Sequence, residues 1–143
     1  HLFVSLHPKY RSILLTSTSQ RIHILSAQDF FPLYQYFDLL ITDYSSSFVD
    51  FLLLNRPLLF YPYDLADYMK NEGISVDYDA ITPGPKVYEA SKLADGIAAI
   101  FKHDAYAKKR QAVRDQYHTY VDSHNARRVM EILDDQLSLK SKP

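Results

Sequence analysis

The side chains best suited to chemistry lie in the middle of the chain, where an apolar run meets small hydroxyl residues. Residues 39–42 are apolar up to a final threonine, Asp43 and Ser45 to Ser47 follow, and residues 48–54 are mostly apolar again. Asp and Ser favour helix N-termini, because their side-chain oxygens accept hydrogen bonds from the free amides. The same amides, with the positive end of the helix dipole, bind an anion when a ligand displaces the caps. The pattern is therefore compatible with a phosphate site.

A buried strand and a helix must hold such a turn in place. Residues 39–42 read as a parallel strand, because a strand covered on both faces is continuously apolar. Asp50 then lies one turn into the helix, and Arg56 with Pro57 ends it before a second apolar strand at 58–61. Ordinary helix capping would select the same Asp and Ser residues, so the local pattern alone leaves both interpretations open.

Taken with residues farther along the chain, this block resembles the CDP-glycerol glycerophosphotransferase family, the polymerases and primases of teichoic-acid synthesis. The similarity covers about residues 3 to 133 and is most specific in the Thr-Asp-Tyr-Ser-Ser block. The matching residues are 41–46, Asp50 and Phe51, Arg56 and Pro57, 60–64 and Tyr68, supported by Leu6-His7-Pro8, Pro83-Gly84-Pro85, Asp122 and Arg127.

The resemblance implies a fold and a domain boundary. We expect an α/β domain, a Rossmann-like parallel sheet flanked by helices, which forms the C-terminal half of a GT-B type glycosyltransferase fold. Residues 1–137 would be this nucleotide-donor-binding domain, a fragment of a larger two-domain enzyme, and residues 138–143 a flexible tail. The N-terminal half, which the chain lacks, would bind the acceptor and carry a catalytic base. The isolated chain is then expected to bind donor without turnover.

The resemblance also assigns roles to single residues. His7, which follows the first predicted strand at the edge of the sheet where α/β proteins bind ligands, would be catalytic and assist departure of the CMP-side phosphate. Asp50 would bind the ribose, and Tyr63 and Asp64 are second-rank candidates in a loop that could enclose a base or acceptor. The residues for the CDP diphosphate would be Thr42, Asp43, Ser45, Ser46 and Arg127, although Ser123 replaces the glycine that follows Asp122 in the family's pattern.

The implied partners are a CDP-glycerol or similar CDP-alditol donor and a lipid-linked polymer acceptor. The implied location is the cytoplasm at the inner face of the bacterial membrane; the resemblance leaves room for membrane contact by the full-length enzyme, and the mixed charges of this chain favour a solvated helix instead. No cofactor is implied, and the sequence suggests no metal site. With three glycines in the chain, neither of the usual glycine-rich phosphate fingerprints can be built.

Composition is that of one soluble globular domain, with 143 residues of which 47% are hydrophobic and 23% charged. A net charge of −1 disfavours a general nucleic-acid binder. The absence of cysteine suits a reducing compartment. We expect no signal peptide, and no apolar stretch approaches the roughly 20 residues of a membrane helix.

The other elements are predicted from apolar spacing and from start and stop residues. Strands are expected at 1–6 and 22–25, and helices at 26–37, at 65–72 before Gly73, and from 91 onward. Leu93, Ile97, Ile100 and Phe101 would form a buried stripe, Lys108, Lys109, Arg110 and Arg114 a solvated face, and Val129, Met130 and Leu133 one face of a last helix at 125–136.

Alternative functions remain open at this point. A receiver domain phosphorylated on Asp43 would need an acidic pair where the chain has His7-Pro8-Lys9, and a serine hydrolase using Ser45 or Ser46 would need flanking glycines that are absent. A related nucleotide-sugar glycosyltransferase for surface polysaccharide, a phosphate-binding regulatory module and a degenerate interaction domain are further alternatives. Sequence alone does not separate cytidine from uridine donors, glycerol from ribitol, or polymerase from primase.

Overall fold

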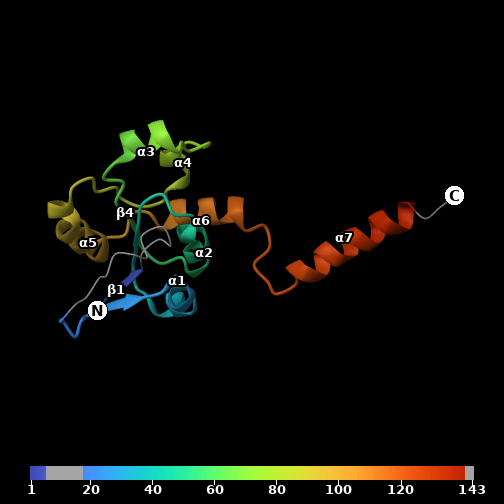
Figure 1. Cartoon of the computed structure of the whole chain (residues 1–143), viewed down its shortest axis with the longest axis horizontal. Helices are drawn as coiled ribbons and strands as arrows, with labels where there is room; N and C mark the ends of the chain where they lie inside the picture. Colours follow the sequence, from blue (N-terminus) through green and yellow to red (C-terminus); the bar gives the residue numbers. More distant parts are fainter. Residues whose placement is uncertain (6–17, 141–143) are drawn as a thin grey trace.

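The computed structural model describes residues 1–5 and 18–140, so the predictions for His7 and for residues 141–143 lie outside the described residues. Figure 1 shows an α/β body from which the last helix projects. None of the described helices is long and apolar enough to cross a membrane. The strands are β1 (Leu2–Ser5), β2 (Ile22–Leu25), β3 (Leu40–Thr42) and β4 (Leu58–Phe60). The α-helices are α1 (Ala27–Phe30), α2 (Ser47–Phe51), α3 (Leu65–Asn71), α4 (Tyr78–Ile81), α5 (Leu93–Lys102), α6 (Ala107–Tyr117) and α7 (Asn125–Lys140), and the 3-10 helices are η2 (Phe31–Tyr36), η3 (Leu52–Leu54) and η4 (Ala90–Lys92).

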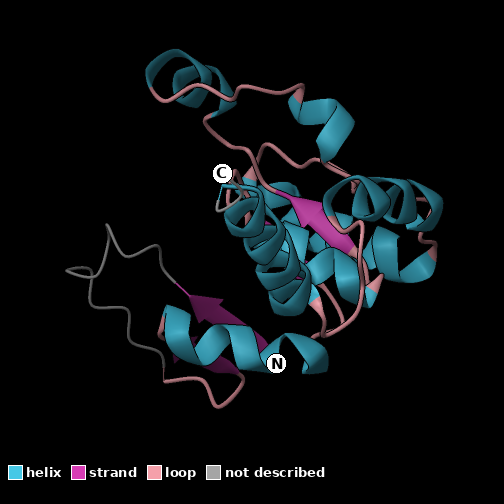
Figure 2. Cartoon of the chain, turned by 90° about the vertical axis from the view of Figure 1, so that its right-hand side faces the viewer, coloured by secondary structure: helices cyan, strands magenta, loops and turns pink. Residues whose placement is uncertain are grey.

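The strands pair in parallel, as predicted. β1 lies beside β2 with Leu2 opposite Ile22, and β3 lies beside β4 with Leu40 opposite Leu58. Among the described residues they form two separate pairs. Figure 2 shows helices on both sides of the β3–β4 pair, which explains why the β4 side chains are fully buried. The continuous apolar pattern of this strand therefore has the predicted cause.

The segment around Gly84 packs against β4. Thr82, Pro83 and Gly84 are buried. The Phe60 amide donates to the Pro85 carbonyl at 2.9 Å, and the Val87 amide donates to the Phe60 carbonyl at 2.8 Å. Residues 85–87 thus add a third backbone to the open edge of β4, because an unpaired strand edge leaves its amides and carbonyls without partners.

Several helix predictions are confirmed and others need correction. The helix expected at 26–37 starts at Ser26 but becomes the 3-10 helix η2 at Phe31, next to Pro32. Gly73 follows α3 with a φ of 76°, as expected for a residue after a helix end. In the predicted α5 stripe Ile100 is buried, whereas Phe101 is 56% exposed.

The last helix is longer than predicted and stands apart from the body. α7 continues through Lys140, four residues beyond the predicted end at 136 and into the segment expected to be a tail. Its apolar face, which includes Val129, Met130 and Leu133, is exposed. Figure 1 shows why, since α7 points away from the other helices.

The prediction of a solvated basic face on α6 is wrong for Arg110. Arg110 is only 1% exposed and forms a two-pronged ion pair with Asp104, with nitrogen–oxygen distances of 2.9 and 2.5 Å. It also donates to the carbonyl of Asn55 at 3.2 Å. Asn55 ends η3 in the left-handed conformation, with a φ of 49°. Arg110 therefore ties α6 to the point where the chain turns from η3 into β4.

We expect Asp104→Asn to lower the free energy of unfolding by about 2 to 3 kcal/mol, because it leaves the buried Arg110 cation without its counter-charge. The Arg110 guanidinium, against the opposing effect of burial, holds the pKa of Asp104 below its usual range. The stability that this pair contributes is therefore present above a pH of about 4 and is lost as the pH falls through the lower folded-state pKa. Urea denaturation from pH 3 to pH 8 would measure both effects.

The matched control is Asp115→Asn, since Asp115 also pairs with an arginine of α6, Arg114, but is 58% exposed. Its cost is expected to stay below about 0.5 kcal/mol, as for other surface pairs. Equal losses of unfolding free energy in Asp104→Asn and Asp115→Asn would contradict a stabilising role for the Asp104–Arg110 pair. So would a difference in unfolding free energy between wild type and Asp104→Asn that does not become smaller in acid.

A second prediction concerns the close approach of Gly84 to β4. A Cβ atom at this position would lie 2.2 Å from the Leu58 carbonyl oxygen, so Gly84→Ala must displace the backbone of residues 85–87. We expect it to cost about 2 to 3 kcal/mol of unfolding free energy, as in overpacked cores. Gly73→Ala is the control, because that position has positive φ but open space and should cost about 1 kcal/mol. Urea denaturation measures the free energy of unfolding of both variants. A loss in Gly84→Ala no larger than the loss in Gly73→Ala would refute the steric argument.

Candidate functional site

The turn between β3 and α2 is capped by Asp43. Its Oδ1 accepts hydrogen bonds from the amides of Tyr44 and Ser45 at 2.7 and 3.2 Å. Ser46 occupies the N-cap position of α2 but makes no side-chain capping bond. The carboxylate predicted to cap the helix therefore binds the amides of the turn instead, and of the predicted caps only Ser45 reaches an amide of α2, that of Ser47.

Ser45 and Ser47 pair with each other above the start of α2. The Ser45 hydroxyl donates to the Ser47 Oγ at 3.0 Å, and the Ser47 amide donates to the Ser45 Oγ at 3.3 Å. Ser45 and Ser46 are exposed. An incoming oxyanion can replace these internal acceptors, because hydroxyl and amide donors at a helix start favour negative charge. The arrangement is thus a set of donors that the protein satisfies with its own acceptors.

Two tyrosine hydroxyls hold this turn from the other side. Tyr78 donates to the Asp43 carbonyl at 2.8 Å, and Tyr44 donates to the Asp64 Oδ1 at 2.8 Å. The Tyr44 ring also stacks on Tyr68 of α3, with centroids 3.9 Å apart. Burial raises the pKa of both tyrosines, with the Asp64 carboxylate adding to the rise for Tyr44 and the Asp43 carboxylate for Tyr78. Both hydroxyls therefore remain donors at neutral pH.

The helix that delivers Tyr78 is itself fastened at several points. Asp77 caps α4 by accepting from the amides of Asp79 and Ala80 at 2.9 and 3.3 Å. Lys86 forms an ion pair with Asp79 at 2.9 Å, and Lys109 of α6 donates to the Asp79 carbonyl at 2.7 Å. Sequence patterns give no sign of the Tyr78 contact, because its acceptor lies 35 residues away along the chain.

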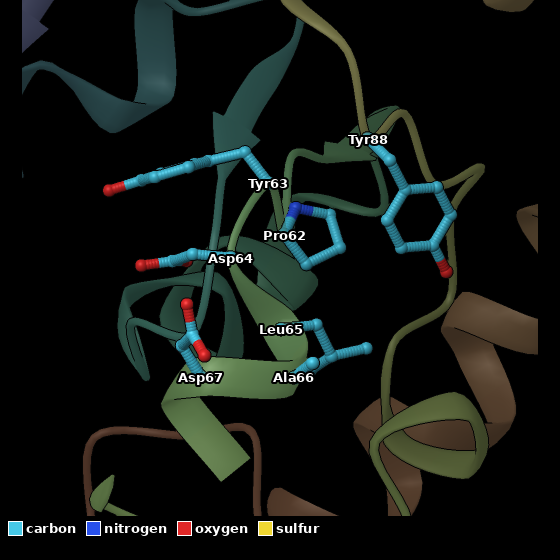
Figure 3. Close-up of a pocket in the computed structure, with 7 residues that line it drawn as sticks. All are labelled: Pro62, Tyr63, Asp64, Leu65, Ala66, Asp67 and Tyr88. Atoms are coloured by element: carbon cyan, nitrogen blue, oxygen red, sulfur yellow. The ribbon is translucent and has the colours of Figure 1, made fainter. Parts of the chain in front are cut away.

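Tyr63 and Asp64 line a pocket of about 460 Å³ after β4. In Figure 3, Tyr63, Asp64 and Asp67 point to one side of Pro62, and the Tyr88 ring lies on the other side. Leu65 and Ala66 complete the lining. Since Asp64 accepts the Tyr44 hydrogen bond, the pocket borders the β3–α2 turn. The structure therefore brings these second-rank candidates next to the predicted phosphate turn.

The other predicted site residues lie in different surroundings. Thr42 is half-buried at the end of β3, where its carbonyl accepts from the Tyr61 amide at 2.7 Å. Asp50 is exposed in the first turn of α2, close in sequence to Ser47. No group of three or more His, Asp or Glu side chains in the described parts of the chain could hold a metal ion.

Arg127 is exposed on α7, and within the described residues it forms no hydrogen bond or ion pair with the turn. The neighbouring Arg128 instead pairs with Asp122, at 2.9 and 2.5 Å. Arg128 also lies over the Tyr120 ring, 3.8 Å from its centroid. The structure thus leaves the role of Arg127 as an anion contact untested, while it assigns Asp122 to Arg128.

Comparison with known proteins agrees with the fold. Residues 1–134 match the family model described as CDP-glycerol:poly(glycerophosphate) glycerophosphotransferase. The structure of the wall teichoic acid polymerase TagF superimposes with a TM-score of 0.72 and 23% identity, over 98% of this chain and 35% of that one. A TagF variant soaked with CDPG gives a TM-score of 0.64 and 26% identity, over 85% and 31% of the two chains. The predicted Rossmann-like half of a GT-B type fold is thereby confirmed.

Curated relatives extend the similarity to sequence. The chain is 33% identical over 138 residues to the teichoic acid glycerol-phosphate primase of Bacillus subtilis (strain 168), covering 96% of this chain and 35% of the relative. It is 31% identical over 140 residues to the teichoic acid ribitol-phosphate primase of Bacillus spizizenii (strain ATCC 23059 / NRRL B-14472 / W23), with the same coverage of 96% and 35%. The chain thus spans about a third of the length of these relatives. It belongs to the CDP-glycerol:poly(glycerophosphate) glycerophosphotransferase family.

Proposed function

We propose that this chain is the donor-binding domain of a transferase that moves glycerol phosphate from CDP-glycerol to a growing teichoic acid polymer. The observation that carries the proposal is the Asp43-capped turn at the start of α2, in a chain whose family membership extends over residues 1–134. The turn offers amide and hydroxyl donors to a diphosphate without a metal ion or a covalent nucleophile. A second candidate donor is CDP-ribitol, which the similarity to a ribitol-phosphate primase favours.

The reaction requires stabilisation of a leaving group. An acceptor hydroxyl oxygen bonds to the phosphorus that carries glycerol, the bond from this phosphorus to the bridging oxygen breaks, and CMP leaves with an added negative charge. Ser45, Ser46 and the helix amides neutralise that charge, and His7 donates a hydrogen bond or a positive charge to the same phosphate. The acceptor proton passes to a base outside this chain.

The nucleoside end of the donor occupies the pocket beside the turn. Tyr63 and Tyr88, which are 59% and 52% exposed, offer aromatic faces to a base. Asp50, in the first turn of α2, accepts hydrogen bonds from the ribose hydroxyls. The polymer acceptor binds the part of the enzyme outside this chain, at the cytoplasmic face of the membrane, where the enzyme is peripheral.

Calorimetric titration with CDP, CDP-glycerol, UDP and ADP tests the proposal. We expect saturable binding of the cytidine compounds that weakens by about tenfold in His7→Ala and Asp50→Ala, since each loses a hydrogen bond to a charged or polar ligand group. Asp95→Ala is the control, because Asp95 is an exposed carboxylate in the first turn of α5. The absence of nucleotide binding, or measurable turnover by this chain alone, would contradict the domain assignment.

The pocket assignment makes a separate prediction. Tyr88→Ala should weaken CDP binding by about 5- to 150-fold, because base–aromatic stacking contributes about 1 to 3 kcal/mol per base. It should leave the affinity for inorganic pyrophosphate unchanged, since that probe has no base. Competition between the two probes on the same sample provides the measurement. An equal loss for both would place Tyr88 at the phosphate turn instead.

A further inference from the structure

Asp64 belongs to the pocket after β4 and to the β3–α2 turn at the same time. Its side chain lines the pocket of about 460 Å³, and its Oδ1 accepts the hydrogen bond of the Tyr44 hydroxyl at 2.8 Å. Tyr44 is itself held by its ring, which stacks on Tyr68 of α3 with centroids 3.9 Å apart. One oxygen of the Asp64 carboxylate therefore has a fixed partner, which sets the orientation of the whole group.

Helix capping does not explain an aspartate at this position. Asp64 occupies the N-cap position of α3, where an aspartate usually accepts hydrogen bonds from the first amides of the helix. Within the described residues it makes no side-chain capping bond, and its carboxylate is turned towards Tyr44. The direction of this side chain therefore serves the pocket and the turn rather than the helix that follows it.

The lining of the pocket offers acceptors to the edge of a base. Tyr63 and Tyr88 supply aromatic faces, and the charged side chains of the lining, among the described residues, are the carboxylates of Asp64 and Asp67. In Figure 3 both carboxylates point to the same side of Pro62 as the Tyr63 ring. A base bound beside this ring therefore has carboxylate oxygens within reach of its polar edge.

A carboxylate distinguishes cytosine from uracil. Cytosine carries an amino group at C4, which donates hydrogen bonds, whereas uracil carries a carbonyl oxygen there, which accepts them. A carboxylate only accepts, so it binds the cytosine amino group and repels the uracil oxygen. The N3–H group of uracil compensates little for this repulsion, because it lies between two carbonyl oxygens that the carboxylate must also approach.

We propose that Asp64 is the residue that selects cytosine, with its Oδ2 accepting a hydrogen bond from the N4 amino group of the donor while Tyr44 holds its Oδ1. This inference rests on the proposed function, because it needs the base of the donor in this pocket. It makes Tyr44 a positioning residue, since the Tyr44 hydroxyl decides which atom of the Asp64 side chain faces the base.

Asp64→Asn should reverse the base preference. The carbonyl oxygen of the new side chain can still accept the Tyr44 hydrogen bond, and its amide nitrogen, a donor, then stands where Oδ2 stood. We expect the wild type to bind CDP about ten- to a hundredfold more tightly than UDP. Asp64→Asn should bind UDP about two- to tenfold more tightly than CDP, because its amide donates to the uracil O4.

Tyr44→Phe shows whether Tyr44 sets this orientation. The two oxygens of a carboxylate are equivalent, so the single variant should keep the preference for CDP. In the double variant with Asp64→Asn the amide can turn either way, and CDP and UDP should bind about equally. Asp115→Asn is the control for the loss of one negative charge, because Asp115 lies on α6 and is 58% exposed, and it should keep the wild-type ratio of affinities.

Calorimetric titration with CDP, UDP and inorganic pyrophosphate measures these ratios, and thermal unfolding without ligand shows that each variant is folded. A further titration of the wild type uses the pyrimidinone nucleoside diphosphate that lacks the amino group. This analogue should bind about tenfold or more weakly than CDP, because it has no donor for the carboxylate. The comparison tests the amino group in the unaltered protein.

The outcomes separate this inference from the proposed function. CDP binding by the wild type that is no tighter than UDP binding, or a preference for CDP that persists in Asp64→Asn, would overturn the inference and leave the donor-binding role standing. Equal losses for CDP, UDP and pyrophosphate in Asp64→Asn and Tyr44→Phe would also overturn it, since Asp64 would then only hold the turn. No binding of CDP or inorganic pyrophosphate by the wild type would overturn the proposed function and the inference together.

Discussion

The buried Arg110 cation is the constraint on which the site geometry depends. A charge with 1% exposure must be neutralised inside the protein, and Asp104 with the Asn55 carbonyl does so. Because Asn55 ends the helix formed by α2 and η3, this contact fixes that end of the helix. At the other end of α6, His118 donates from Nε2 to the Val49 carbonyl of α2 at 2.9 Å. α6 therefore braces the helix whose start carries the serine hydroxyls.

The turn at the start of α2 is held by groups from later in the chain. Tyr78 fixes the Asp43 carbonyl from α4, and Asp64 fixes Tyr44 from the loop after β4. The Asp43 side chain is then left to cap the amides of the turn, and Ser45 and Ser46 are exposed to solvent. A rigid backbone with exposed donors is what recognition of a charged ligand requires, because fixed dipoles need little reorganisation when the charge arrives.

The parts of this design that depend on local sequence could be predicted, and the parts that depend on distant contacts could not. The apolar runs predict β3 and β4, and the small polar residues between β3 and α2 predict the capped turn, since both follow from neighbouring residues. Arg110 reads as one more cation on a solvated face, because nothing near it in sequence reveals the Asn55 carbonyl, 55 residues away. The Tyr78 hydroxyl likewise finds its acceptor, the Asp43 carbonyl, 35 residues away along the chain. The apolar face of α7 was predicted, but its exposure was not, since helical spacing of apolar residues does not say what covers them.

The polar groups at the start of α2 satisfy one another. The Asp43 carboxylate accepts hydrogen bonds from two amides, and the Ser47 Oγ accepts one from the Ser45 hydroxyl. A ligand must therefore replace these internal hydrogen bonds, and its binding free energy contains only the difference between the new bonds and those it replaces. That difference favours an oxyanion over a neutral group, because charged acceptors form stronger bonds with the same donors.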